Sequence, residues 1–297
     1  MPWIQAHLTI DKTCVPLIEL LFETLGSQAV SLGDAADEPM LEPGPGETPL
    51  WQATRVSGLF PGSTDTDALR SALNQALGVD AGQSLRLAHL DDRDWERAWL
   101  DQFRPMRFGR RLWIRPTGHQ IAQREAVVVD LDPGLAFGTG THPTTALCLG
   151  WLDGYDVRGL QIIDFGCGSG VLGIAALKLG AAHVIAVDHD PQALMATRDN
   201  AMRNGVSDRI HVLNSADLAG QTADVVLANI LTNILVELAP RILDLLEPGG
   251  HLALSGVLKP QAGAIIQAYA NAIDFAPMTT QQDWVLLHGR RRQTKTV

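Results

Sequence analysis

A glycine-rich turn that follows a short apolar run is the feature that most constrains the fold of this chain. Residues 161–165 read Gln-Ile-Ile-Asp-Phe, the glycines Gly166, Gly168 and Gly170 come next, and an apolar run begins at Val171. Glycine adopts positive φ without strain and lets a ligand approach the backbone closely. The first turn of a helix also offers free N–H groups and the positive end of its dipole. The pattern therefore predicts a buried strand, a ligand-binding turn and a helix, in that order.

Strand-like and helix-like runs alternate through the rest of the C-terminal part. Strands are expected at residues 162–165, 183–188, 210–213, 225–229, 251–255, 275–279 and 284–288, and helices between them include 191–203 and 233–246. Alternation of this kind predicts an α/β fold with a doubly wound, mostly parallel sheet. A ligand of such a sheet binds at the carboxyl ends of its strands.

The N-terminal part follows a different order. Strand, helix, strand, strand, helix and strand are expected at residues 3–10, 15–25, 29–32, 51–60, 65–77 and 85–90. This is the order of a small α+β, ferredoxin-like domain. The part contains no cluster of His, Cys or paired carboxylates that suggests catalysis, so it is interpreted as a recognition domain.

These patterns divide the chain into three segments. Residues 1–92 are expected to form the ferredoxin-like substrate-recognition domain, and residues 111–297 the catalytic domain. The segment 93–110 between them is interpreted as a helical linker, because Trp95, Trp99 and Phe103 recur at helical spacing.

Composition and charge exclude several classes of protein. Hydrophobic residues make up 46% of the chain and charged residues 19%, as in a globular protein. The net charge of −10 argues against wide, non-specific contact with nucleic acid, which requires a basic surface. The three cysteines are scattered, and neither a signal peptide nor a membrane-spanning run is evident. We expect a monomeric cytoplasmic enzyme with no metal site and no membrane association.

Two acidic residues discriminate between ligands of the glycine turn. The segment from Gly168 to Gly173 also matches G-x-G-x-x-G, which suggests a dinucleotide. Asp164, however, lies two residues before the first glycine, where a carboxylate repels a pyrophosphate but suits a cationic α-amino group such as that of S-adenosylmethionine. Asp188 ends the next strand, where it can accept hydrogen bonds from ribose hydroxyls. The alternatives are a helix-capping or turn role for Asp164 and a turn role for Asp188.

Two further segments are candidates for the same site. Asn229 ends the fourth predicted strand of this unit, so its carboxamide is expected to face the reacting centre, to accept a hydrogen bond from a nucleophilic nitrogen or to hold the cofactor. A simple strand-terminating role is the alternative. Upstream, the run from Phe137 through Thr139 to Thr145 is rich in glycine and hydroxyls, which are expected to close over the cofactor. His142 within it is either a base or a structural residue.

The motif Asp164-Phe-Gly-Cys-Gly-Ser-Gly170 with Asp188 resembles the cofactor motifs of class I methyltransferases. The run from Asp132 to Thr145, together with Ala228-Asn-Ile-Leu231, resembles the family that methylates ribosomal large-subunit protein eleven. This resemblance implies S-adenosylmethionine as cofactor and cofactor contacts at Thr145, Gly166, Asp188 and Asn229. It also implies the substrate: lysine ε-amines and the N-terminal α-amine of that protein, methylated up to the trimethyl state.

Three other functions are alternatives to methylation of this ribosomal protein. A methyltransferase for nucleic acid or for another protein would have a similar core, although the acidic charge counts against RNA. A nicotinamide-dependent oxidoreductase is opposed by Asp164, and no proton-relay constellation supports it. A non-catalytic module that only retains the fold is disfavoured by the intact glycine turn, both acids and Asn229.

Overall fold

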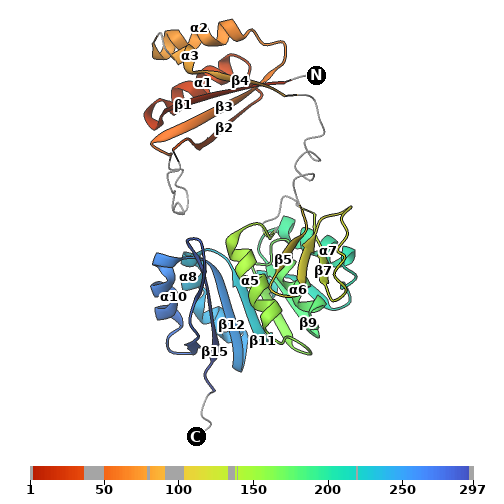
Figure 1. Cartoon of the computed structure of the whole chain (residues 1–297). Coiled ribbons are helices and arrows are strands. Elements are labelled where there is room, and N and C mark those ends of the chain that lie inside the picture. The colour runs from red at the N-terminus through yellow and green to blue at the C-terminus, as the bar shows by residue number, and fades with distance from the viewer. Residues whose placement is uncertain are drawn as a thin grey trace. The chain divides into compact units, whose positions relative to one another are not determined.

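The computed structural model describes residues 3–36, 50–78, 81–90, 104–132, 138, 140–218 and 220–293. The chain divides into two compact units, Met1–Ala98 and Trp99–Val297, each with its own hydrophobic core (Figure 1). None of the helices in these described segments is long and apolar enough to cross a membrane.

The N-terminal unit is a four-stranded antiparallel sheet with helices. Its elements are β1 (Trp3–Asp11), α1 (Val15–Thr24), β2 (Ala29–Asp34), β3 (Ala53–Pro61), α2 (Thr66–Leu77), α3 (Ala81–Ser84) and β4 (Arg86–Leu90). The strand order is β2-β3-β1-β4, and every neighbouring pair is antiparallel. Both the element order and the sheet are those of the expected ferredoxin-like domain.

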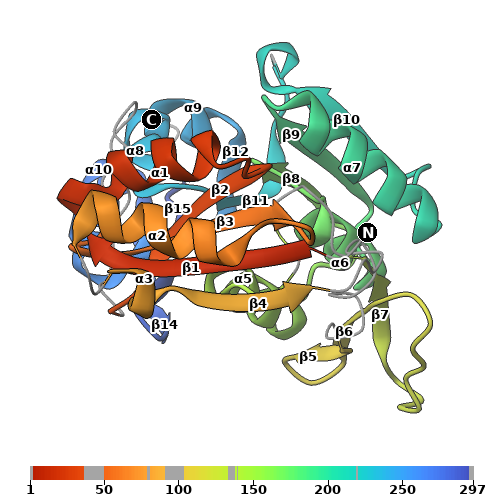
Figure 2. The ribbon, with the colours of Figure 1, turned by 90° about the horizontal axis from the view of Figure 1, so that it is seen from above.

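Alternation along the strands builds the core of this unit. Ile4 and Leu8 of β1 and Val56 of β3 are buried with Phe22 of α1 and Leu73 of α2. Since successive side chains of a strand point to opposite faces, one face of the sheet packs on the helices (Figure 2).

The C-terminal unit contains the expected doubly wound sheet. Its elements after residue 160 are β8 (Gln161–Phe165), α6 (Val171–Lys178), β9 (His183–Asp188), α7 (Pro191–Arg203), β10 (Ile210–Asn214), β11 (Ala223–Asn229), α8 (Thr232–Glu237), α9 (Ala239–Asp244), β12 (Leu246–Leu258), α10 (Ala262–Tyr269), β13 (Ile273–Phe275), β14 (Thr279–Gln281) and β15 (Trp284–Arg291). The order is β10-β9-β8-β11-β12-β15-β13, with β14 on β15. The strands from β10 to β12 are parallel and β15 is antiparallel. The strand order reverses direction between β8 and β11, which is where an open α/β sheet binds its ligand.

Helices cover both faces of this sheet. Val225 and Leu227 of β11 belong to the core cluster that contains α6, whereas Val226 and Ala228 belong to the cluster that contains α8, α9 and α10. The consecutive buried residues therefore face opposite layers, which explains why the strands read as continuous apolar runs. Figure 2 shows α7 beside β9 and β10.

A small three-stranded sheet precedes the doubly wound one. It consists of β5 (Met106–Phe108), β6 (Leu112–Arg115) and β7 (Val127–Asp130), and it is followed by α5 (Pro143–Gly154). A helical linker is expected at 93–110, but its described residues, 104–110, are not helical. They contain β5, which pairs antiparallel with β6 through a tight turn in which Gly109 has a φ of 64°. Residues 91–103, which include Trp95, Trp99 and Phe103, lie outside the described residues.

Two other elements differ from expectation because of proline. The single helix expected at 233–246 is two short helices, α8 and α9, that meet at Leu238. Pro240 lies in the first turn of α9, where its missing N–H is tolerated, but inside a continuous helix it would remove a hydrogen bond. The strand expected at 275–279 is likewise two strands, β13 and β14, with Pro277 between them.

Candidate active site

The glycine turn joins β8 to α6 at the carboxyl end of the sheet. Gly166, Gly168 and Gly170 all have positive φ, and Gly170 is the N-cap of α6. The N–H groups of Gly166 and Cys167 donate to the carbonyl of Val187 at 2.7 and 3.0 Å, which ties the turn to the end of β9. A side chain at position 166 would collide with Ile230, so the turn requires glycine there both for its φ and for space.

Helix α7 holds the same turn from the other side. The hydroxyl of Thr197, which is fully buried, donates to the carbonyl of Gly168 at 3.0 Å. The carboxamide of Asn200 donates to the carbonyl of Ser169 at 2.9 Å. The sequence reasoning missed both residues, although their three-residue spacing on a predicted helix places them on one face.

Asp188 lies at the end of β9, next to the glycine turn. Its Oδ2 accepts from the N–H of Gly168 at 3.0 Å, and its Oδ1 accepts from the N–H groups of His189 and Asp190 at 2.8 and 3.0 Å. The side chain is 11% exposed. Asp188 is therefore a turn acid that also links β9 to the glycine turn. Its Oδ1 already accepts two bonds, whereas Oδ2 accepts one and can accept a second from a ligand hydroxyl.

Asp164 is buried beneath the turn at the end of β8. Its Oδ2 accepts from the N–H of Gly173 in the first turn of α6 at 2.9 Å. Its Oδ1 is buried and has no hydrogen-bond partner among the described residues. Burial raises the pKa of this carboxyl to about 7, the N–H of Gly173 opposes the rise, and the charge of Asp188 adds to it. The capping role is thus present, and one acceptor remains available for a cationic group.

Asn229 and Thr145 meet across the switch point of the sheet. The carboxamide nitrogen of Asn229, the last residue of β11, donates to the hydroxyl of Thr145 at 3.3 Å. Thr145 lies in the first turn of α5 and is fully buried. The Oδ1 atom of Asn229 is buried without a partner among the described residues.

The upstream glycine run contacts the turn directly. Ser169 Oγ donates to the carbonyl of Gly138 at 2.8 Å. His142 is the N-cap of α5 and accepts from the N–H of Thr144, which supports the structural interpretation of this histidine. Phe137 and Thr139, both expected to contact the cofactor, lie outside the described residues.

These residues fit S-adenosylmethionine. The glycines leave the backbone open to a ligand, Asp164 supplies an acceptor for an ammonium group, and Asp188 supplies acceptors for hydroxyls. A pyrophosphate does not suit a turn with the carboxyl of Asp164 beneath it, because like charges repel. The fold and this loop define a class I methyltransferase that depends on S-adenosylmethionine.

Comparisons with known proteins narrow the class to one family. The family model described as "Ribosomal protein L11 methyltransferase (PrmA)" matches residues 2–292. The chain is 50% identical to the "Ribosomal protein L11 methyltransferase" of Marinobacter nauticus over 296 residues, which is 98% of this chain and 99% of the relative. It is 51% identical to that of Azotobacter vinelandii over 293 residues, 98% of this chain and 100% of the relative.

A solved structure agrees with this result. The ribosomal protein L11 methylase of Lactobacillus delbrueckii subsp. bulgaricus is 33% identical and superimposes with a TM-score of 0.60, covering 64% of this chain and 100% of that chain. The chain belongs to the ribosomal protein L11 methyltransferase family.

Proposed function

We propose that this chain methylates ribosomal protein L11, transferring methyl groups from S-adenosylmethionine to lysine ε-amines and to the N-terminal α-amine, up to the trimethyl state. The proposal rests on one observation above all. Relatives named for this activity are about 50% identical over 98% of the chain, so the likeness includes the N-terminal unit as well as the common catalytic fold.

The described geometry supports a set of proposed cofactor contacts. Gly166 and Gly168 leave backbone open to the methionine part of the cofactor, and Asp164 balances its α-amino group. Asp188 accepts from the ribose hydroxyls, and Thr145 with Asn229 closes the site at the end of β11. Phe137 and Thr139 of the upstream glycine-rich run are also expected to contact the cofactor.

The methyl-transfer reaction requires little of the protein beyond holding the two substrates in position and excluding water. The donor supplies an electrophilic methyl group on a sulfonium, so the chain's own residues must orient the amine and exclude water. A lysine ammonium, with an ordinary pKa of about 10.4, must first lose its proton, and desolvation lowers that pKa. In the first two transfers, the unpartnered Oδ1 of Asn229 accepts a hydrogen bond from the amine and directs its lone pair at the methyl group. The tertiary amine of the third transfer has no N–H and attacks without this bond. Asn229 is thus the proposed catalytic residue.

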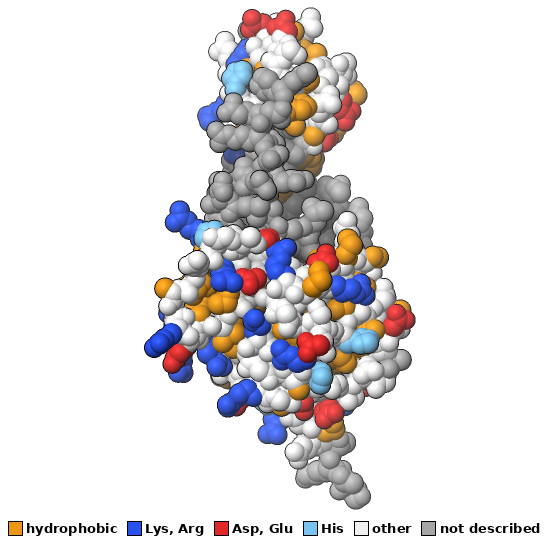
Figure 3. Space-filling view, turned by 90° about the vertical axis from the view of Figure 1, so that its right-hand side faces the viewer, with side chains coloured by type: hydrophobic (Ala, Val, Ile, Leu, Met, Phe, Trp, Pro, Cys, Tyr) orange, Lys and Arg blue, Asp and Glu red, His pale blue; other side chains and the backbone are white. Residues whose placement is uncertain are grey.

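The two units divide this work. Residues 1–92 recognise the protein substrate, residues 93–110 connect the units, and residues 111–297 bind the cofactor and carry the reaction. Acidic and basic side chains are interspersed on the face of the molecule in Figure 3, which suits contact with a protein. The proposed enzyme is a cytoplasmic monomer that needs neither nucleic acid nor a membrane.

A methyl-transfer assay tests the proposal. The full chain is incubated with S-adenosylmethionine labelled on the methyl group and with purified ribosomal protein L11, and the product is analysed by mass spectrometry. We expect stepwise mass increments that end at trimethylated amines, and no transfer to L11 whose amines have been acetylated. Transfer to ribosomal RNA and not to L11 would replace the substrate with a nucleic acid. Failure to bind the donor in calorimetry would overturn the proposal entirely.

A further inference from the structure

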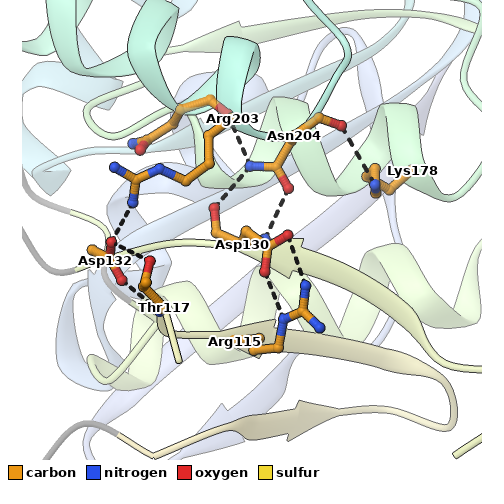
Figure 4. Close-up of polar contacts among 8 residues, drawn as sticks. Arg115, Thr117, Asp130, Asp132, Lys178, Arg203 and Asn204 are labelled. Atoms are coloured by element: carbon orange, nitrogen blue, oxygen red, sulfur yellow. Dashed lines mark hydrogen bonds and ion pairs between the residues drawn. The ribbon is translucent and has the colours of Figure 1, made fainter. Parts of the chain in front are cut away.

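The C-terminal end of α7 contacts a second segment of the site, about seventy residues earlier in the chain. Thr197 and Asn200 hold the glycine turn, and the next residues on the same side of the helix, Arg203 and Asn204, reach the end of β7 (Figure 4). Helix α7 therefore contacts both the glycine turn and the end of β7.

Asn204 fixes the backbone at the last residue of β7. Its Nδ2 donates to the carbonyl of Asp130 at 2.8 Å, and its Oδ1 accepts from the N–H of the same residue at 2.8 Å. Asn204 is only 7% exposed, and its Nδ2 also donates to the carbonyl of Asn200 at 2.8 Å. A single carboxamide thus satisfies both backbone groups of Asp130 in the way that a neighbouring strand would.

Arg203 fixes the chain two residues further on. Its guanidinium forms an ion pair with Oδ2 of Asp132, the first residue of the run that resembles the family motif. The N–H and the hydroxyl of Thr117 both donate to the same carboxylate at 2.7 Å. Burial acts to raise the pKa of Asp132, but the hydrogen bonds from Thr117 and the charge of Arg203 outweigh it, so that the carboxylate stays ionised. Figure 4 shows this carboxylate between Arg203 and Thr117.

The far part of the same run is tied to the same assembly. Gly138 accepts from Ser169 Oγ, and the carbonyl of Ser169 is held by Asn200. Asp132 is therefore attached to α7, and Gly138 to the turn that α7 holds.

We propose that Arg203 and Asn204 are positioning residues for binding of the methyl donor. They fix the chain at Asp130 and Asp132, where it leaves β7, six residues before Gly138, whose carbonyl accepts from Ser169 of the glycine turn. This inference rests on the proposed function, because it takes the glycine turn and Gly138 as parts of the cofactor site. It also gives a role to Asp132, which is not a proposed cofactor contact: Asp132 is the ion-pair partner through which Arg203 acts.

Variants of the ion pair test the inference with little risk to the fold, since the side chains of Arg203 and Asp132 are 42% and 26% exposed. We expect Arg203→Met and Asp132→Asn each to weaken S-adenosylmethionine binding about three- to tenfold in calorimetry, as expected for one lost hydrogen bond. The double variant should bind no more weakly than either single one, since both remove the same interaction. Arg203→Lys should recover part of the loss. KM for the donor should rise more than kcat falls.

Arg198→Met is the matched control. Arg198 is an exposed arginine of the same helix whose guanidinium also donates to a carbonyl, that of Val212 in β10 at 3.1 Å, away from both glycine segments. Its loss should leave donor affinity unchanged. Asn204→Ala should weaken binding at least as much as Arg203→Met. It should also lower the melting temperature, because the N–H and the carbonyl of Asp130 lose their hydrogen-bond partner.

The outcomes separate this inference from the proposed function. If Arg203→Met and Asp132→Asn lower the melting temperature but bind the donor like the wild type, the contacts only stabilise the fold and the inference is wrong while the proposed function stands. If the wild-type chain itself does not bind the donor, both are overturned.

Discussion

The carboxamide nitrogen of Asn229 donates to the hydroxyl of Thr145 at 3.3 Å, and this bond links the end of β11 to the first turn of α5. It leaves the other end of the carboxamide, Oδ1, buried and without a partner among the described residues. An unpartnered buried acceptor costs free energy in the protein alone, and a ligand that donates to it would offset this cost.

We expect Asn229→Ala to lower kcat/KM for methyl transfer about tenfold or more, since it removes the acceptor for the reacting amine or for the cofactor. Thr145→Val should have a smaller effect in the same direction, because it frees the carboxamide without removing it. Thr145→Ser, which keeps the hydroxyl, is the control and should resemble the wild type. Steady-state kinetics with both substrates varied measures this, and normal kcat and KM in Asn229→Ala would remove Asn229 from the mechanism.

Replacement of Gly166 by alanine should disrupt the cofactor turn. Its φ of 77° is strained for any residue with a side chain, and the added methyl group would collide with Ile230. We expect a loss of roughly 1–3 kcal/mol in the free energy of unfolding and a weaker affinity for S-adenosylmethionine. Denaturant unfolding and calorimetry measure the two effects.

Gly150→Ala is the matched control for this glycine. Gly150 lies inside α5, and a Cβ there would have no heavy atom within 4 Å outside its own helix turn and its chain neighbours. Alanine should therefore stabilise the helix by up to about 1 kcal/mol. If the two variants behaved alike, the special backbone of Gly166 would not matter to the site.

The buried carboxyl of Asp164 predicts an unusual dependence of stability on pH. Burial raises its pKa to about 7 in the folded chain, against an ordinary value of 3.8. Between these values the unfolded chain has released the proton while the folded chain still holds it, so this group's contribution makes the free energy of unfolding fall as pH rises from about 4 to 7. The full effect is roughly 4 kcal/mol at most.

Asp164→Asn isolates this contribution, because an amide does not titrate. Unfolding of both proteins should be measured at intervals across this pH range. We expect the variant to gain stability relative to the wild type as pH rises from 4 to 7, and the difference to level off above pH 7. A constant difference over the whole range would mean that Asp164 ionises normally in the fold.

The sequence predicted the elements that carry strong local signals. The helix expected at 191–203 is found with those bounds, because Asp190 caps it and Pro191 occupies its first turn. The strand expected at 183–188 is also found unchanged. Asp164 and Gly166 are predicted as site residues from the order of strand, glycine turn and helix, and Asp188 from its place at the end of the next strand; both are short-range patterns.

The missed features depend on contacts between distant residues. The strands β5 and β7 have three and four residues, too few for their alternation to show in the sequence. The hydrogen bonds between Asn204 and Asp130 join residues 74 positions apart, and the sequence around Asn204 contains no pattern that predicts this partner. Local patterns therefore predict the candidate ligand contacts, whereas the residues that hold these candidates in place could be identified only from the fold.

Asp188 has one observed role and one proposed role, and a single experiment can separate them. Its carboxylate holds the glycine turn through the N–H of Gly168, and it is also the proposed acceptor for the ribose hydroxyls. We expect Asp188→Ala to weaken S-adenosylmethionine binding roughly 10- to 100-fold, the effect of losing hydrogen bonds to a charged group. An analogue that lacks the ribose hydroxyls should bind the wild type more weakly, and Asp188→Ala should affect that analogue far less than the natural donor. If the variant weakened both ligands equally, Asp188 would act only by holding the turn, and the ribose contact would have to come from another residue.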